Sequence, residues 1–306
     1  MAILRSLRRI PIVNRITRNI LKSIGNLNDK ILSHWRISGK VKLNFNNIYF
    51  NYYASCDDHI VDLLYYNKNY HETGELRLFL ELSKHCRSIF DIGANTGLYS
   101  ILTAIGNKSC EIIAFEPHPT NINRLKKNIS LNNILNVKIV EKALGNTIGK
   151  INFSIPLDDS VADTSSANSE FSRATYEGRI KWKEIEVPQI TLDSLCEEDQ
   201  IKTVDLVKLD VEGYEMEVLQ GGTLFFQKFS PVIFCEILLD EKRKEFFDKF
   251  LSQNNYQPYL VLNDGLLRLD NGIIKNYDGL NYVFSKNKTP EQFTSFKKME
   301  FLVKSL

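Results

Sequence analysis

The sequence lacks the cysteine pattern of a disulfide framework or a zinc site. Its cysteines are odd in number and far apart, and none forms a Cys-x-x-Cys pair. They are Cys56, Cys86, Cys110, Cys196 and Cys235. This pattern excludes a small disulfide-stapled domain and predicts reduced thiols, as in the cytoplasm.

Long hydrophobic runs are also missing. No stretch approaches the roughly 18 apolar residues that identify a transmembrane helix. The basic N-terminus is not followed by an apolar segment of signal-peptide length, because Pro11, Asn14, Arg15 and Arg18 interrupt it. We therefore expect a cytoplasmic protein.

The chain has little net charge, but that charge is unevenly distributed. The formal charge is +2, whereas residues 1–40 carry nine basic residues and one acid, Asp29. That segment, the basic arm, has a charge of +8, which leaves −6 on the remainder. Apolar residues from Ile3 to Ile24 recur at helical spacing, so we expect an amphipathic helix that Pro11 breaks or restarts. The arm predicts peripheral contact with the inner membrane surface; a solvated or packed helix is the alternative.

Short apolar strands alternate with helices from residue 69 onward. The strongest strand patterns are at Ser88–Ile92, Glu111–Phe115, Val137–Val140, Val204–Leu209 and Val232–Cys235. Helices between successive strands predict an α/β fold with a doubly wound, mainly parallel sheet. We place this domain at 69–290, after an N-terminal extension of helix and short strands at 1–68 and before a C-terminal tail at 291–306.

The segment Ile89–Gly97 joins a predicted buried strand to a helix through a glycine turn. In open α/β sheets such a turn lies at the carboxyl edge, where cofactors bind. Gly93 and Gly97 suit a tight turn or a close approach to a ligand. The turn has the pattern Gly-x-Asn-x-Gly, centred on Asn95, and not the Gly-x-Gly-x-x-Gly of a dinucleotide site. In addition, Asp91 at the strand end would repel a pyrophosphate.

A carboxylate at that position suits a cationic ligand. S-adenosylmethionine carries an ammonium and a sulfonium, and its carboxylate can bind free amides at the start of the next helix. The following strand ends in Glu116, where an acid can bind the two hydroxyls of a ribose. Asp91, Glu116 and the glycine turn together favour S-adenosylmethionine. A phosphate or nicotinamide ligand on the same fold is the alternative.

Three segments resemble the successive signatures of the FkbM methyltransferase family. They are FDIGANTGLYS, AFEPHPTNINRLKKNISLNN and VDLVKLDVEGYEMEVLQGG, which occur in this order between about His71 and Glu236. The resemblance implies a class I (Rossmann-like) methyltransferase fold and O-methylation, often of sugars or natural-product hydroxyls. It assigns five residues to the cofactor site: Asp91, Gly93, Asn95, Gly97 and Glu116. It also assigns Glu72 to the cofactor site. Alternatively, Glu72 only stabilises its helix, because an acid is favourable near a helix N-terminus.

Acidic residues follow the fourth and fifth core strands. Asp210, Glu212 and Glu215 come after the fourth, and Glu236 ends the fifth. Since the carboxyl ends of parallel strands share one edge, we expect Asp210, Glu212 and Glu236 to be catalytic, one of them as the base for a hydroxyl. Asp210 and Glu236 could instead bind Mg²⁺. Glu212 and Glu215 also have the spacing of helix-capping residues.

An insertion interrupts the α/β pattern between Lys150 and Leu195. Two strand-like segments flank a polar loop whose small residues suit a hydroxylated substrate. These residues are Asp163, Thr164, Ser165, Ser166 and Asn168. The loop alternatively faces water only.

Three functions compete at this point. The first is an O-methyltransferase acting on a small-molecule or glycan acceptor, which could be lipid-linked. The second is an RNA methyltransferase, which the basic arm favours. The acids after the fourth strand would repel phosphates, and the Asn/Asp-Pro-Pro-Tyr/Phe motif of amino-group methylation is missing. Nucleic acid is therefore not the expected partner. The third is a catalytically silent membrane-associated module, which would have no use for Asp91 and Glu116.

Overall fold

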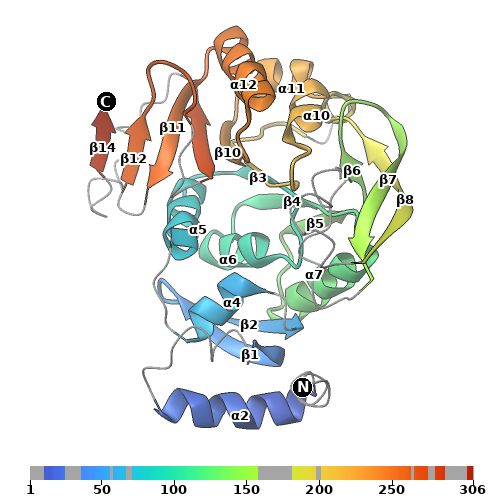
Figure 1. Cartoon of the computed structure of the whole chain (residues 1–306), viewed down its shortest axis with the longest axis vertical. Coiled ribbons are helices and arrows are strands. Elements are labelled where there is room, and N and C mark those ends of the chain that lie inside the picture. Colours follow the sequence, from blue (N-terminus) through green and yellow to red (C-terminus); the bar gives the residue numbers. More distant parts are fainter. Residues whose placement is uncertain are drawn as a thin grey trace.

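The structure is a computed structural model of the 306-residue chain. It describes residues 10–24, 36–55, 58–66, 71–157, 181–197, 201–262, 265–274, 280–286 and 302–305. A large sheet with helices on both faces forms the body, and the N-terminal elements lie together at one end of it (Figure 1).

A nine-stranded sheet runs through the body in the order β14-β12-β11-β13-β10-β9-β3-β4-β5. The strands are β3 (Ser88–Ile92), β4 (Glu111–Phe115), β5 (Val137–Val140), β9 (Leu206–Leu209), β10 (Val232–Glu236), β11 (Gln257–Leu262), β12 (Gly265–Arg268), β13 (Asn281–Ser285) and β14 (Leu302–Ser305). The five strands from β10 to β5 pair in parallel, and β13 is antiparallel to both β10 and β11. The predicted doubly wound, mainly parallel sheet is thus confirmed. Strand β14, within the predicted C-terminal tail, pairs with β12 at the sheet edge.

Helices cover both faces of this sheet because the core strands are apolar on both sides. One set comprises α5 (His71–Ser83), α6 (Leu98–Gly106) and α7 (Pro119–Leu131), and the other comprises α9 (Leu192–Leu195), α10 (Glu215–Gln220), α11 (Thr223–Phe229) and α12 (Glu241–Asn254). In β3, Ile89 packs into the cluster that contains residues of α5 and α6, whereas Phe90 packs into the cluster of α11 and α12. Because neighbouring side chains of β3 point to opposite faces of the sheet, the two sets of helices lie on opposite faces.

The N-terminal extension packs directly on the α/β body. Strands β1 (Ser38–Phe45) and β2 (Ile48–Ser55) form a hairpin, whose turn at Asn46-Asn47 has positive φ at both residues. Helix α4 (His59–Tyr65) follows. Tyr52 and Leu98 of α6 belong to one hydrophobic cluster, so a continuous core crosses the predicted boundary at residue 68.

Helix α2 (Pro11–Ile24) begins at the proline that was expected to break or restart the arm. Its packing differs from the expected packed alternative, because Asn14 and Arg18 are buried while Ile12, Ile16 and Ile20 are exposed. None of the helices in the described part of the chain has the length and apolar character to span a bilayer.

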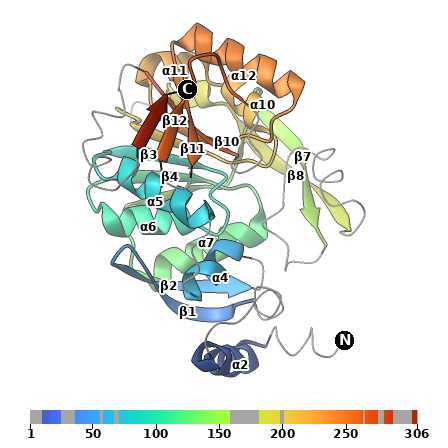
Figure 2. The ribbon, with the colours of Figure 1, turned by 60° about the vertical axis from the view of Figure 1, so that its left-hand side comes forward.

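The insertion forms a separate three-stranded sheet of β6 (Ala143–Leu144), β7 (Gly149–Pro156) and β8 (Trp182–Ile190). Its long hairpin β7-β8 projects beside the main sheet (Figure 2). The polar loop with Asp163, Thr164, Ser165, Ser166 and Asn168 lies outside the described residues. Of the cysteines, Cys56 also lies outside them, and the described ones are free thiols.

Candidate active site

A cavity lies at the carboxyl edge of the sheet, at the point where the order of the strands reverses. Strands β3 and β9 are neighbours, and the chain builds outward from β3 through β4 and β5 and from β9 through β10. Ligands bind at such switch points in open α/β sheets, beyond the carboxyl ends of the strands. A cavity of about 240 Å³ lies there, lined by the turn after β3, the end of β4, the loop after β9 and the start of α4.

The turn after β3 is shaped by close contacts within the protein. Gly93, Asn95 and Gly97 all have positive φ, at 81°, 51° and 91°. A Cβ at Gly93 would lie 1.8 Å from the carbonyl oxygen of Asp210, and one at Gly97 would lie 2.2 Å from Leu125 Cδ1. The two glycines are therefore required by β9 and α7 pressing against the turn, in addition to any ligand. Asparagine tolerates this left-handed region better than most residues.

Glu116 lies at the end of β4 and lines the cavity. Its carboxylate accepts hydrogen bonds from the backbone N–H of Asn95 and of His118, both at 2.8 Å. Burial raises the pKa of Glu116 to about 7, against the lowering effect of these hydrogen bonds. The contact with Asn95 joins the glycine turn to the predicted ribose acid. It also means that one turn amide expected to bind the ligand already has a partner.

The cavity beside Glu116 has the chemical character of a nucleoside site. Phe115, Leu144 and Phe153 supply an apolar wall next to the carboxylate. Among the described residues, no group donates a hydrogen bond to the buried Oδ1 of Asn95, which also lines the cavity. A carboxylate for a ribose, an apolar wall for a base and a polar oxygen without a donor fit the nucleoside end of S-adenosylmethionine.

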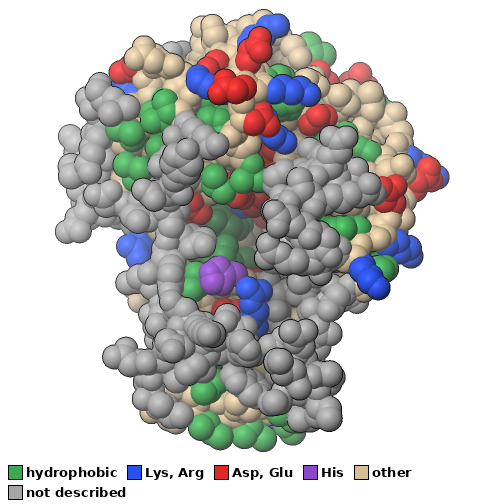
Figure 3. All heavy atoms as spheres, in the orientation of Figure 1, with side chains coloured by type: hydrophobic (Ala, Val, Ile, Leu, Met, Phe, Trp, Pro, Cys, Tyr) green, Lys and Arg blue, Asp and Glu red, His purple; other side chains and the backbone are tan. Residues whose placement is uncertain are grey.

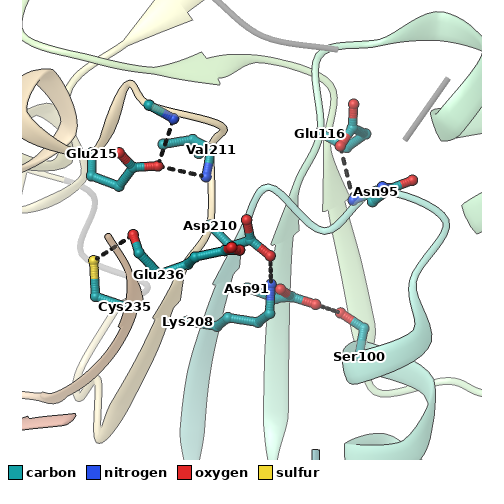
Figure 4. Close-up of polar contacts among 11 residues, drawn as sticks. Asp91, Asn95, Ser100, Glu116, Lys208, Asp210, Val211, Glu215, Cys235 and Glu236 are labelled. Atoms are coloured by element: carbon teal, nitrogen blue, oxygen red, sulfur yellow. Dashed lines mark hydrogen bonds and ion pairs between the residues drawn. The ribbon is translucent and has the colours of Figure 1, made fainter. Parts of the chain in front are cut away.

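The sequence predicts that Asp91 faces the cavity, but its side chain is buried within the protein. It is 1% exposed and accepts a hydrogen bond from Ser100 Oγ at 2.6 Å (Figure 4). Burial raises the pKa of Asp91, while the nearby Lys208 ammonium acts to lower it. Lys208 lines the cavity, whereas Asp91 is not among the described residues that line it. Asp91 thus interacts with the charge of Lys208, which does line the cavity, and its predicted contact with the cofactor stays a prediction.

A buried charge network lies at the ends of β9 and β10. Lys208 Nζ is 2.8 Å from Asp210 Oδ2 and 4.5 Å from the ring centre of Tyr99. Burial would lower the pKa of Lys208, but the carboxylates of Asp210 and Asp91 outweigh it and raise that pKa. The lysine is therefore charged.

Asp210 and Glu236 share a hydrogen bond at adjacent strand ends. Burial opposes ionisation of Asp210, yet Lys208 holds its pKa below the usual range. Burial and the charge of Asp210 raise the pKa of Glu236 well above its usual value. Asp210 is thus the ionised member, and Glu236 carries the proton that it donates to Asp210. The predicted meeting of these two acids is confirmed by this contact.

The loop after β9 presents Glu212 to the cavity and turns Glu215 away from it. Glu212 lines the cavity and has a φ of 54°, a strained value for a residue with a Cβ. Glu215 accepts hydrogen bonds from the backbone of Val211 and Gly213, at 3.3 and 2.9 Å. Burial raises the pKa of Glu215 to about 7. Glu215 therefore shapes the loop, and of the acids after β9 it is Asp210 and Glu212 that reach the cavity.

The residues do not fit the predicted magnesium ion. In the described part of the chain, no three His, Cys, Asp or Glu side chains form a group that could hold a metal. Asp210 already contacts an ammonium, and Glu236 is protonated, whereas Mg²⁺ prefers bare carboxylate oxygens. The magnesium site stays an untested prediction.

Other residues of the site were missed or lie beyond description. The side chain of Glu72 is outside the described residues. Glu75 in the same helix is buried. The pKa of Tyr99 is raised mainly by burial of its own ring and next by the charge of Glu75. Asp58 and His59 line the cavity from the N-terminal extension. His59 is one of the lone histidines that the sequence offers as a possible base, and Lys208 had a signal as a lone cation within an apolar strand.

Comparison with known proteins matches this region to one family. A family model described as a methyltransferase FkbM domain matches residues 91–258, more than half of the chain. The hexuronic acid methyltransferase AglP of Haloferax volcanii is 29% identical over 162 residues, which is 53% of this chain and 61% of that protein. The 2-O-methyltransferase NoeI of Sinorhizobium fredii is 26% identical over 144 residues, covering 44% and 56%. The chain thus spans somewhat over half the length of these curated relatives.

Among solved structures, the methyltransferase FkbM from Methylobacillus flagellatus KT is similar at 15% sequence identity. That similarity has a TM-score of 0.40 and covers 74% of this chain and 55% of the other.

Proposed function

The chain belongs to the FkbM methyltransferase family, and from this we infer that it transfers a methyl group from S-adenosylmethionine to a hydroxyl of a sugar, glycan or natural-product acceptor. One observation carries the proposal: a single cavity joins a nucleoside-type end at Glu116 to an acidic end at Asp210. The names of the relatives AglP and NoeI, a hexuronic acid methyltransferase and a 2-O-methyltransferase, support a sugar hydroxyl.

The residues around Glu116 would hold the cofactor. Glu116 would accept hydrogen bonds from the ribose hydroxyls, the wall of Phe115 and Leu144 would contact the base, and Asn95 Oδ1 would accept a further hydrogen bond. The bound cofactor supplies a methyl group already activated by its sulfonium. The protein's task is therefore to align the acceptor and to remove its proton.

Asp210 is the proposed base for the acceptor hydroxyl. It lines the cavity and is held ionised by Lys208, so its carboxylate can accept a hydrogen bond from the acceptor hydroxyl and take the proton as methyl transfer makes that hydroxyl acidic. Glu236 donates a hydrogen bond to Asp210 from behind and fixes the orientation of its carboxylate. Lys208 and Glu236 are thus positioning residues, whereas Asp210 would touch the acceptor.

Polar groups near Asp210 suit a hydroxylated acceptor. Glu212, Tyr214, Asp58 and His59 line the same cavity from two different parts of the chain. Sugars are recognised through several hydrogen bonds of this kind. We propose that these residues bind the acceptor, in the cytoplasm, in either a free or a lipid-linked form.

Transfer of label from methyl-labelled S-adenosylmethionine tests the function. Purified protein is incubated with glycan, lipid and RNA fractions of cells, and base-stable label in a sugar is expected. The Asp210→Asn variant serves as the inactive control. Label confined to RNA would contradict the proposal, as would the same labelling by the variant and the unaltered protein.

A further inference from the structure

Helix α2 is attached to the body through its polar residues. Asn14 is fully buried, donates to the Arg36 carbonyl at 2.8 Å and accepts from the Ser38 amide at 3.0 Å. Arg18 is 3% exposed and donates to the carbonyl oxygen of Ser38 at 3.4 Å. Its guanidinium also lies 5.2 Å from the ring centre of Tyr65. Buried hydrogen bonds of this kind fix the rotation of the helix about its axis.

The opposite face of α2 carries isoleucines at helical spacing. Ile12, Ile16 and Ile20 are 58%, 56% and 56% exposed. Residues four apart lie one above the other on a helix, so the three side chains form a stripe. The space-filling view shows hydrophobic side chains along the lower edge, where α2 lies in Figure 1 (Figure 3). This arrangement reverses the usual one, in which the apolar face of a surface helix is buried.

The surroundings of this isoleucine stripe are basic. Residues 10–24 and 36–55 contain no Asp or Glu. Their basic residues are Arg15, Arg18, Lys22, Arg36, Lys40 and Lys42. Arg15, Lys40 and Lys42 are exposed, and β1, which carries the two lysines, is the strand on which α2 packs. A positive surface around an apolar stripe is complementary to an anionic bilayer, and less so to a neutral protein groove.

We propose that the isoleucine stripe of α2 inserts into the headgroup region of an anionic phospholipid membrane. Helix α2 lies at one end of the molecule, with the main sheet beyond the β1-β2 hairpin, in both ribbon views (Figures 1 and 2). A membrane bound to this end leaves the cavity on the body uncovered. The proposal is independent of the methyl-transfer reaction.

Sedimentation of the full chain with lipid vesicles tests this proposal. Vesicles of equal parts phosphatidylglycerol and phosphatidylcholine are compared with phosphatidylcholine alone, at low and high salt. We expect binding to the anionic vesicles only, and weaker binding at high salt because charges are screened. Replacing the isoleucines together (Ile12→Ser, Ile16→Ser, Ile20→Ser) should weaken binding about tenfold or more. Arg15→Glu should weaken it about fivefold or more at low salt.

Leu135→Ser is the matched control, since Leu135 is 97% exposed on the connection between α7 and β5. It should bind vesicles like the unaltered chain. Equal binding by the triple variant, or equal binding to neutral vesicles, overturns the proposal. Loss of a dimer in the triple variant without vesicle binding would assign the stripe to a second copy of the chain. If the triple variant unfolds, Arg15→Glu and the salt dependence decide the outcome.

Discussion

Lys208 Nζ lies 2.8 Å from Asp210 Oδ2, two residues further along the same chain. Side chains two apart in a strand point to one face, so the sequence Lys-Leu-Asp itself creates this ion pair at the end of β9. Asp91 of the neighbouring strand adds a second carboxylate near the same ammonium. Lys208 therefore links β3, the strand before the cofactor turn, to Asp210, the proposed base.

Removing the lysine charge should destabilise the protein strongly. Lys208→Met leaves the buried Asp91 and the half-buried Asp210 without their cation, which costs about 3–5 kcal/mol of unfolding free energy. The cost should be largest at pH 8 and smaller at pH 5, because burial already raises the pKa of Asp91 and protonation removes its charge. Urea unfolding at the two pH values measures this.

A second substitution makes that test specific. In Lys208→Met with Asp91→Asn, one of the two uncompensated carboxylates is gone, so part of the lost stability should return. The same loss with and without Asp91→Asn would show that the charge of Asp91 does not contribute to the effect. Asp91→Asn alone serves as the reference for a non-additive effect.

Asp210→Asn separates turnover from cofactor binding. The amide cannot accept the acceptor's proton, so the turnover number should fall by about 10²-fold or more. Cofactor affinity should stay within about tenfold, because Asp210 is assigned to the acceptor end of the cavity. Calorimetry gives the affinity, and label transfer gives the rate. Glu217→Gln, in helix α10 just beyond the loop after β9, is the control. Parallel loss of affinity and rate would move Asp210 to the cofactor end.

Glu116→Ala should weaken binding of S-adenosylmethionine by about tenfold or more, because the variant lacks the charged hydrogen-bond acceptor for the ribose. Glu111→Ala, at the exposed start of the same strand, should bind normally. Calorimetry at pH 8 compares the two. Because burial raises the pKa of Glu116 to about 7, affinity of the unaltered protein should also fall as the pH drops below 7. Unchanged affinity in Glu116→Ala would remove the assignment of the ribose site.

The core of the fold was predictable because long periodic segments carry a strong signal. The strands Ser88–Ile92, Glu111–Phe115 and Val137–Val140 have the predicted bounds. Short elements were missed, since the four residues of α9 and the two of β6 cover only about one period of their patterns. Strand Val204–Leu209 begins two residues later, at Leu206, where pairing with β3 starts.

Some residues of the candidate site were predictable from the sequence, and others were not. Glu116 and Asp210 were identified because strand ends in a parallel sheet share one edge. The position of Asp91 was misjudged, because its partner Lys208 lies 117 residues away and only the sheet order brings them together. Asp58 and His59 line the cavity through the packing of α4 on β1 and α5, which no local pattern in the sequence predicts.

Glu215→Gln should stabilise the protein at pH 8. Burial raises the pKa of Glu215 from 4.5 to about 7, so the stability contributed by its protonated form is full below pH 4.5 and lost as the pH rises through about 7. Glutamine stays neutral and keeps a carbonyl oxygen for the Gly213 amide. The gain should be about 1–3 kcal/mol at pH 8 and close to zero at pH 4.5, from 1.36 kcal/mol per pKa unit. Urea unfolding at both pH values measures it, with Glu217→Gln as the control in the same helix. A variant that is less stable at pH 8 would show that the loop needs the carboxylate charge to hold the amides of Val211 and Gly213.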